Sequence, residues 1–216
     1  MDRVHPAGLF EAVFTRRRTL FAYRLRVSEH TGQTDEIDDP YRFPPILSEY
    51  DLYLLREGTH LKEYEKLGAH TTKLDGVPGV NFAVWAPNAR RVSVVGNFNR
   101  WDGRRHPMRN HPGNGIWEIF IPGLDEGALY KFEIRPRSGE EIALKADPFA
   151  FAFEPAPRTA SIVTDLDAYR WADHEWMEAQ RRHNPLERPL TIYEVHLGSW
   201  LRVPEEIGRA SCRERV

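Results

Sequence analysis

An internal repeat constrains the fold of this 216-residue chain more than any other feature of its sequence. Four features recur in the same order: a glycine before an apolar stretch that ends in Glu, a tyrosine, a second glycine and an Asp-Pro pair. The spacing is constant until one residue is inserted before Asp-Pro. The matching segments are Gly8–Glu11 with Gly115–Glu118, Tyr23 with Tyr130, Gly32 with Gly139, and Asp39–Phe43 with Asp147–Phe151. We interpret the chain as two copies of one module, of which the second is complete and the first begins in its middle.

The second copy has the side-chain alternation that is typical of β-strands. Four stretches carry this alternation, and Gly, Pro, Asn and Asp punctuate the chain between them. They are residues 80–86, 91–96, 115–123 and 129–134. Short strands at this spacing predict an all-β fold built on an immunoglobulin-like β-sandwich, complete in the second copy and partial in the first.

Helical signals and a late apolar stretch divide the rest of the chain. Ser48 is placed to cap a helix between the two copies, and Asp173 is placed to cap a short helix within residues 172–183. Residues 190–200 have the composition of a strand that is buried on both faces. The expected boundaries are a partial first sandwich at 1–46, a helical linker at 47–69, a complete sandwich at 70–165, a linker with a short helix at 166–189, a further folded segment at 190–206 and a tail at 207–216.

Composition excludes several classes of protein. The 30 Lys and Arg residues are balanced by 32 Asp and Glu, which argues against a basic field for binding duplex nucleic acid. No apolar run reaches the length of about 18 residues that a membrane helix needs, and the N-terminus lacks the apolar core of a signal peptide. The single cysteine, Cys212, lies in the tail, and the histidines lack metal-ligand spacing. We expect a cytoplasmic protein without metal or cofactor, and without nucleic acid or membrane as a partner.

A longer motif links the second copy to a known family. The stretch "FAVWAPNARRVSVVGNFNRWDGRRHPM", residues 82–108, resembles the family-48 carbohydrate-binding module that precedes the catalytic barrel of bacterial glycogen branching enzymes. The stretches "EGTHLKEYEKLGAH", "LYKFEI" and "KADPFAF" are similar to the same family. The resemblance covers residues 7–206 and implies that the first copy is a second sandwich of the same type.

The resemblance also implies a chemistry. Residues 192–200, "IYEVHLGSW", resemble the first strand of the family's (β/α)8 barrel, a fold of about 250 residues, so we expect only its truncated start at 190–206. The implied reaction cleaves an α-1,4-glucan through an Asp nucleophile and a Glu acid, and transfers the segment to a 6-hydroxyl. Both carboxylates belong to later barrel strands, so no catalytic residue is assigned and the chain by itself is expected to be inactive. Glu194 and His196 are interpreted as structural.

Glucan binding is the function that this chain itself could have. Aromatic side chains cover the weakly apolar faces of sugar rings, and polar side chains bond the hydroxyls. Trp101 and Lys131 match binding residues of the related glycogen-binding modules, and Asn97 is a third candidate, although a role in the turn suits it as well. A further Trp that those modules carry after the "YKF" strand is missing here. Trp85 and Trp117 are expected to be core or half-buried.

Two other interpretations remain at this stage. The chain could be a non-catalytic α-glucan-binding module, or the front end of a debranching or trehalose-releasing relative. In the branching-enzyme interpretation, the partners are α-glucan and the protein's own catalytic barrel. Residues 207–216 can be back-translated into a string that is similar to a DNA-sequencing adapter, so we expect an artefact there.

Overall fold

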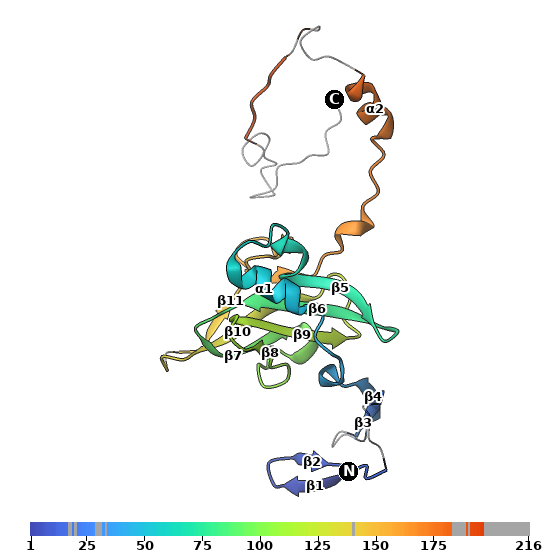
Figure 1. The fold of residues 1–216 in the computed structure, drawn as a ribbon, viewed down its shortest axis with the longest axis vertical. Coiled ribbons are helices and arrows are strands. Elements are labelled where there is room, and N and C mark those ends of the chain that lie inside the picture. The colour runs from blue at the N-terminus through green and yellow to red at the C-terminus, as the bar shows by residue number, and fades with distance from the viewer. Residues whose placement is uncertain are drawn as a thin grey trace. The chain divides into compact units, whose positions relative to one another are not determined.

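A computed structural model of the chain describes residues 1–16, 19, 21–28, 32, 34–139, 141–182, 189 and 191–196. The chain divides into two compact units, Met1–Leu166 and Asp167–Val216, and each is described by itself. Short strands dominate the first unit, and its longest strands are labelled in Figure 1.

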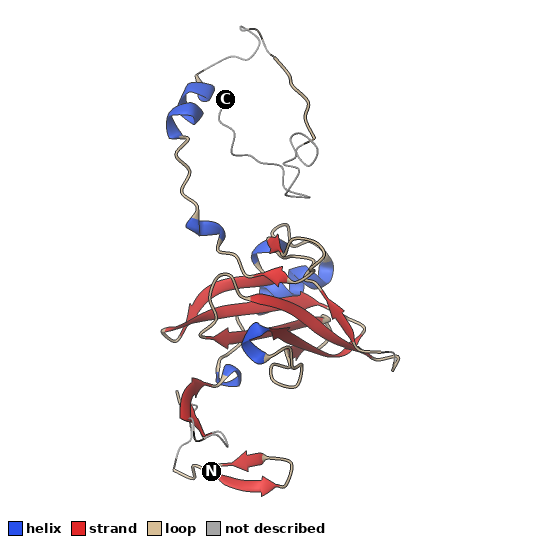
Figure 2. Ribbon diagram, turned by 180° about the vertical axis from the view of Figure 1, so that it is seen from behind, coloured by secondary structure: helices blue, strands red, loops and turns tan. Residues whose placement is uncertain are grey.

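Two antiparallel sheets, drawn red in Figure 2, form the part of the first unit that holds the second repeat copy. One sheet has the order β5 (Gly68–Leu74), β6 (Val77–Trp85), β9 (Ile116–Pro122) and β8 (Arg109–His111). The other has the order β11 (Ala143–Lys145), β10 (Leu129–Pro136), β13 (Ser161–Ile162) and β12 (Ala152–Phe153), and β7 (Ala89–Gly96) also pairs with β10. All four predicted stretches contain a strand, so the predicted all-β fold is confirmed.

The main core takes one face of each long strand. In β6 it takes Val80, Phe82 and Val84, as the alternation predicted. The neighbouring strands add Val92, Val94, Trp117, Ile119, Ile121, Tyr130 and Phe132. Burial of apolar area is the dominant favourable term in folding, so this cluster holds the two sheets together.

The outer face of β6 and β9 is buried as well, which alternation alone does not reveal. Ala83, Ile116 and Phe120 lie under residues 43–67, a segment that includes α1 (Glu49–Glu57), seen against the sheet in Figure 1. The covering side chains are Phe43, Leu47, Leu52, Leu55 and Leu67. Both β6 and β9 are therefore central strands with two packed faces.

The caps of α1 explain where this helix begins and ends. The Ser48 hydroxyl accepts the backbone N–H of Asp51 at 3.0 Å, and the Asp51 carboxylate accepts the Ser48 N–H at 3.1 Å. This capping box satisfies two donors that a helix start leaves unpaired. Gly58, with a φ of 69°, ends the helix in the left-handed conformation that glycine adopts without strain. The predicted Ser48 cap is confirmed.

A buried carboxylate fastens the segment before α1 to strand β9. Glu118 is 1% exposed, and its Oε1 accepts the backbone N–H groups of Ile46 at 2.7 Å and Leu47 at 3.1 Å. Its Oε2 lies 2.8 Å from Nε2 of His111. A buried charge is costly without such partners, so these bonds determine where the segment crosses the sheet.

The first repeat copy reproduces the hairpins of the second. Its strands are β1 (Asp2–His5) with β2 (Leu9–Glu11), and β3 (Arg24–Ser28) with β4 (Thr34–Asp38). The Tyr23 hydroxyl donates to the Asp39 carboxylate at 2.5 Å, as Tyr130 donates to Asp147 at 2.6 Å. In both copies the other carboxylate oxygen accepts the backbone N–H two residues further on, at 2.9 Å. We call this pair of bonds the Tyr–Asp latch.

The first copy does not reach the partial sandwich that its sequence led us to expect. In the part of the chain that the structure describes, its hairpins are two separate two-stranded sheets. In the second copy, β10 also pairs with β7. Among the described residues of 1–46 no strand corresponds to β7, so β3 pairs there only with β4.

Short helical turns complete the first unit, and one helix defines the second. The turns are η1 (Pro40–Arg42), η2 (Glu63–Glu65), η3 (Asn97–Asn99) and, at the junction of the units, η4 (Leu166–Ala168). Helix α2 (His174–Arg181) lies where a helix was predicted, but Asp173 makes no side-chain cap bond. Residues 191–196 form neither helix nor strand, so the expected barrel strand is not formed there, and the rest of that segment and the tail lie outside the described residues. No described helix is long and apolar enough to span a membrane.

Candidate carbohydrate-binding site

The candidate Trp101 is presented by a strained turn that follows β7. Arg100 and Trp101 both have a φ of 58°, in the left-handed region that non-glycine residues rarely adopt. The Trp101 N–H donates to the Gly96 carbonyl at 3.0 Å, and the Asp102 N–H donates to the Asn99 carbonyl at 3.2 Å. Such residues cost about 1–3 kcal/mol each and cluster at binding sites, where the surrounding structure holds them in place. The turn is therefore built around the position of this tryptophan.

The side chain of Trp101 remains partly open to solvent. It is 38% exposed, and its indole N–H donates to Oδ1 of Asn97 at 3.2 Å. Asn97 thus has the turn-forming role that its position suggested. The bond fixes the edge of the indole.

A buried asparagine organises the inside of the turn. Asn99 is fully buried, accepts the Gly96 N–H at 2.9 Å, and donates to the Val94 carbonyl and to Nδ1 of His106, both at 2.8 Å. Burial lowers the pKa of His106, and nearby Arg105 lowers it further. The imidazole therefore stays neutral, which allows Nδ1 to accept the bond from Asn99.

The turn rests on the outer face of β10, and this contact brings Lys131 to the same face. A Cβ atom added to Gly103 would lie 2.2 Å from the Glu133 carboxyl group, so a larger residue there would displace the end of the Glu133 side chain. Glu133 is held in place by Arg91 at 2.5 Å. Lys131 lies two residues before Glu133 in β10, and side chains two residues apart in a strand share a face.

Lys131 is positioned by a loop that the sequence did not single out. Its Nζ donates to the Thr159 hydroxyl at 2.6 Å, which aims the long side chain along the outer face of the sheet. The structure therefore joins Asn97 and Trp101 by a hydrogen bond and places Lys131 on the face where their turn rests. Thr159 and Gly103 are additional residues of the site. The sequence indicated only Gly103, through the turn signal Asp102–Gly103.

The carboxylates beside the Trp101 turn are not arranged for acid–base chemistry. Hydrogen bonds from the Arg104 side chain hold the pKa of Asp102 well below its usual range. Glu133 is likewise committed to Arg91. A general acid or base needs a pKa near the working pH. The arrangement favours binding over catalysis.

Trp85 and Trp117, the two tryptophans that were expected to be core or half-buried, differ in exposure. Trp117 is 6% exposed and its indole donates to the Ala86 carbonyl at 3.0 Å, so the prediction of a core residue is confirmed. Trp85 is 61% exposed, so the prediction that it is core or half-buried is wrong. It is the last residue of β6, and the cluster that buries Ala83 on the same face does not include it. Alternation gives a face, but it does not show how far the cover on that face extends.

Two family models match separate parts of the chain. Residues 1–41 match the N-terminal domain of the alpha-1,4-glucan branching enzyme GlgB. Residues 66–150 match carbohydrate-binding module 48, also described as the isoamylase N-terminal domain. The second match contains all three candidate residues.

Curated relatives cover nearly the whole chain. It is 56% identical over 209 residues to the 1,4-alpha-glucan branching enzyme GlgB of Paramagnetospirillum magneticum, covering 97% of this chain and 28% of that protein. It is 57% identical over 205 residues to the enzyme of the same name from Rubrobacter xylanophilus, covering 95% of this chain and 28% of that protein. The chain thus spans 28% of the length of these relatives.

Among solved structures, the chain is similar to a pullulanase from Bacillus acidopullulyticus. The identity is 22%, the TM-score is 0.43, and the match covers 71% of this chain and 17% of that one. The two family matches, in the order in which they occur along the chain, agree with the curated relatives: this chain matches the N-terminal part of the GlgB 1,4-alpha-glucan branching enzymes, a GlgB N-terminal domain followed by a carbohydrate-binding module 48.

Proposed function

We propose that the chain is the glucan-holding front part of a 1,4-alpha-glucan branching enzyme, and that it binds α-glucan through Trp101, Lys131 and Asn97. The observation that carries this proposal is the turn at Trp101. Two consecutive non-glycine residues in the left-handed region are strained, and they hold a large aromatic side chain partly in solvent. A turn with no role in binding would more economically place glycine or asparagine there.

The chemistry of each residue suits an α-glucan. The indole face of Trp101 covers the weakly apolar face of one glucose ring, and the ring hydroxyls at its edge need polar partners. The Lys131 ammonium has three donors, of which one is given to Thr159. The Asn97 amide, already bonded to the indole through its oxygen, has a nitrogen that can donate to a sugar hydroxyl.

We assign the branching reaction to the longer protein rather than to this chain. In that reaction an α-1,4-glucan is cleaved and the released segment is passed to a 6-hydroxyl of another chain. Holding the glucan near the reacting centre raises its local concentration there, which is the usual benefit of a linked binding module. No catalytic residue is assigned among residues 1–216.

Titration of the 216-residue chain with maltoheptaose, a linear α-1,4-glucan, tests this proposal. We expect Trp101→Ala to weaken binding at least about tenfold, because stacked aromatic anchors carry most of the binding energy in small interfaces. Trp85→Ala is the matched control, since Trp85 is also an exposed tryptophan but belongs to the other sheet. Equal affinities of the wild type and Trp101→Ala would overturn the proposal.

A further inference from the structure

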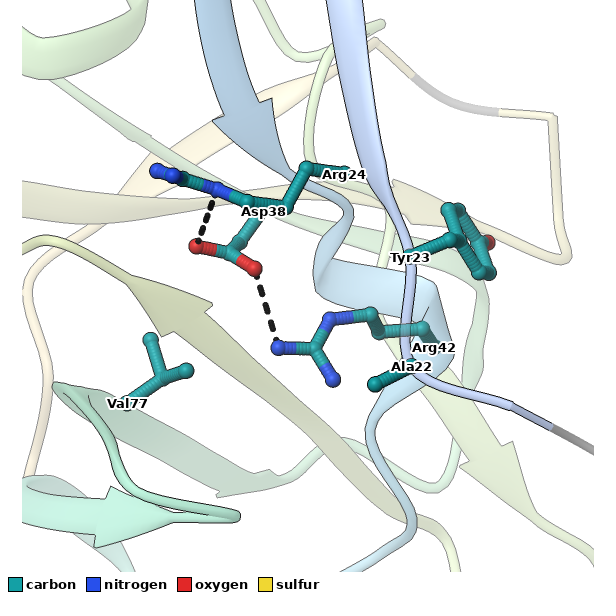
Figure 3. Close-up of a pocket in the computed structure, with 6 residues that line it drawn as sticks. All are labelled: Ala22, Tyr23, Arg24, Asp38, Arg42 and Val77. Atoms are coloured by element: carbon teal, nitrogen blue, oxygen red, sulfur yellow. Dashed lines mark hydrogen bonds and ion pairs between the residues drawn. The ribbon is translucent and has the colours of Figure 1, made fainter.

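A hollow of about 410 Å³ lies beside the first repeat copy, and its lining includes none of the candidate residues of the Trp101 site (Figure 3). It is lined by Ala22, Tyr23, Arg24, Asp38, Arg42 and Val77. Its volume is at the lower end of the range of about 300–1,000 Å³ that is common for sites of small ligands. It is large enough for a sugar residue, and its walls mix charged, aromatic and aliphatic groups.

The polar wall of the hollow is an Arg–Asp–Arg arrangement with unused hydrogen-bonding capacity. Figure 3 shows the Asp38 carboxylate between two guanidinium groups, with Nε of Arg24 at 3.4 Å and a terminal nitrogen of Arg42 at 2.9 Å. The Arg42 side chain is only 7% exposed, and its Nε has no partner in the described part of the chain. Each carboxylate oxygen accepts two bonds, so Asp38 can accept more than these two.

The repeat places Arg24 where the second copy has Lys131. Tyr23–Arg24 aligns with Tyr130–Lys131, and the Tyr–Asp latch fixes the tyrosine in both copies. Arg24 and Lys131 therefore stand at equivalent positions of equivalent strands, each directly after the latched tyrosine. Lys131 of the second copy is a proposed glucan contact, and Arg24 of the first copy lines the hollow.

We propose that this hollow is a second α-glucan contact, supplied by the first repeat copy. A glucose residue fits it with its hydroxyls donating to Asp38 and accepting from Arg24 and Arg42, and with an apolar edge against Val77. A neutral, hydroxyl-rich ligand suits the wall better than a phosphate, because a hydroxyl can both donate to Asp38 and accept from the guanidinium groups, whereas a fully ionised phosphate can only accept. The inference rests on the proposed function, since it takes its ligand class from the Trp101 site.

The test titrates maltoheptaose into the full chain and follows the backbone amide signals of Ala22 and Val77 by NMR. We expect both signals to shift in the wild type, and to shift still in Trp101→Ala, where the first site is weakened. In that background, Arg24→Ala should weaken the remaining binding by about three- to tenfold, as expected for loss of one charged donor. Arg26→Ala is the matched control, because Arg26 lies on the same strand and also pairs with Glu36 but does not line the hollow.

Each outcome separates this inference from the proposed function. If Ala22 and Val77 do not shift while Trp101→Ala abolishes binding, the second contact is wrong and the Trp101 site stands. If Arg24→Ala and Arg26→Ala have equal effects, the second contact is also wrong. If Trp101→Ala leaves the affinity unchanged while Arg24→Ala lowers it, the hollow stands and the Trp101 site fails. The Arg24 side chain is 59% exposed, so its removal should not prevent folding.

Discussion

The two repeat copies have matching sequences and matching hydrogen bonds, but very different burial. Leu9 is 62% exposed and its counterpart Ile116 is 1% exposed, while Phe10 is 55% exposed and its counterpart Trp117 is 6% exposed. The hairpins and the Tyr–Asp latch form in both copies because they depend on residues close in sequence. Burial depends on strands such as β6 and β7 and on the cover near α1, for which the described residues of the first copy have no counterpart. Local geometry and stability are therefore separable in this repeat.

Removal of equivalent apolar side chains should give the largest difference between the two copies in the free energy of unfolding. Phe132 is 1% exposed in the core, whereas its counterpart Leu25 is only half-buried. We expect Phe132→Ala to lower the free energy of unfolding by about 3–5 kcal/mol, and Leu25→Ala by less than about 1 kcal/mol. Urea unfolding followed by tryptophan fluorescence measures both. Equal losses would mean that the first copy is packed as tightly as the second.

Removal of the Tyr–Asp latch should also lower stability more in the second copy than in the first. We expect this difference to be smaller than the one for the apolar side chains. Tyr130→Phe leaves the carboxylate of Asp147, which is 1% exposed, without its hydroxyl donor. We therefore expect the free energy of unfolding to fall by about 1–3 kcal/mol. Tyr23→Phe removes the same bond in a more open setting and should cost less than about 1 kcal/mol. The same unfolding curves report both variants. A larger loss for Tyr23→Phe would contradict the view that burial, rather than the bond itself, sets the cost.

The smallest effect concerns pH and the turn of the second copy. Burial lowers the pKa of His106 below its ordinary value of 6.5, so the unfolded chain takes up a proton first as the pH falls. The stabilising effect of the neutral imidazole is therefore complete above pH 6.5 and is lost as the pH falls through the lowered pKa. We expect His106→Gln to flatten the fall in stability between about pH 7 and 5. His5→Gln, in the first copy, controls for loss of a histidine, and identical slopes for the wild type and His106→Gln would contradict the prediction.

Sequence patterns predicted the strands of the second copy well because its alternation is regular. The face shared by Val80, Phe82 and Val84 was correct, and the cap at Ser48 followed from residue type alone. The exposed position of Trp85 was not predictable, since alternation cannot show where the cover contributed by a distant segment ends. Residues 191–196 are not a strand in the structure, and an apolar composition by itself does not supply a neighbouring strand to pair with.

The candidate site was only partly predictable. Trp101 and Asn97 stand in a turn motif with an obvious polar signature, and Lys131 followed from family resemblance. The contact of Gly103 with Glu133 joins residues that are far apart in sequence, so no local pattern reveals it. The same holds for the bond from Lys131 to Thr159. The hollow beside Arg24 needs the start of β6 at Val77 as its far wall, which only the folded chain provides.

The bonds from Glu118 to the N–H groups of Ile46 and Leu47 have a practical consequence for anyone who excises the second copy. The family match begins at residue 66, yet a protein cut there would lose both donors, the ring of Phe43 and the whole of α1. Glu118 would keep its bond to His111, and the outer face of β9 would lose the part of its cover that Phe43, Leu47, Leu52 and Leu55 supply. We therefore expect the smallest piece that folds by itself to start near Phe43 rather than at the first residue of the family match.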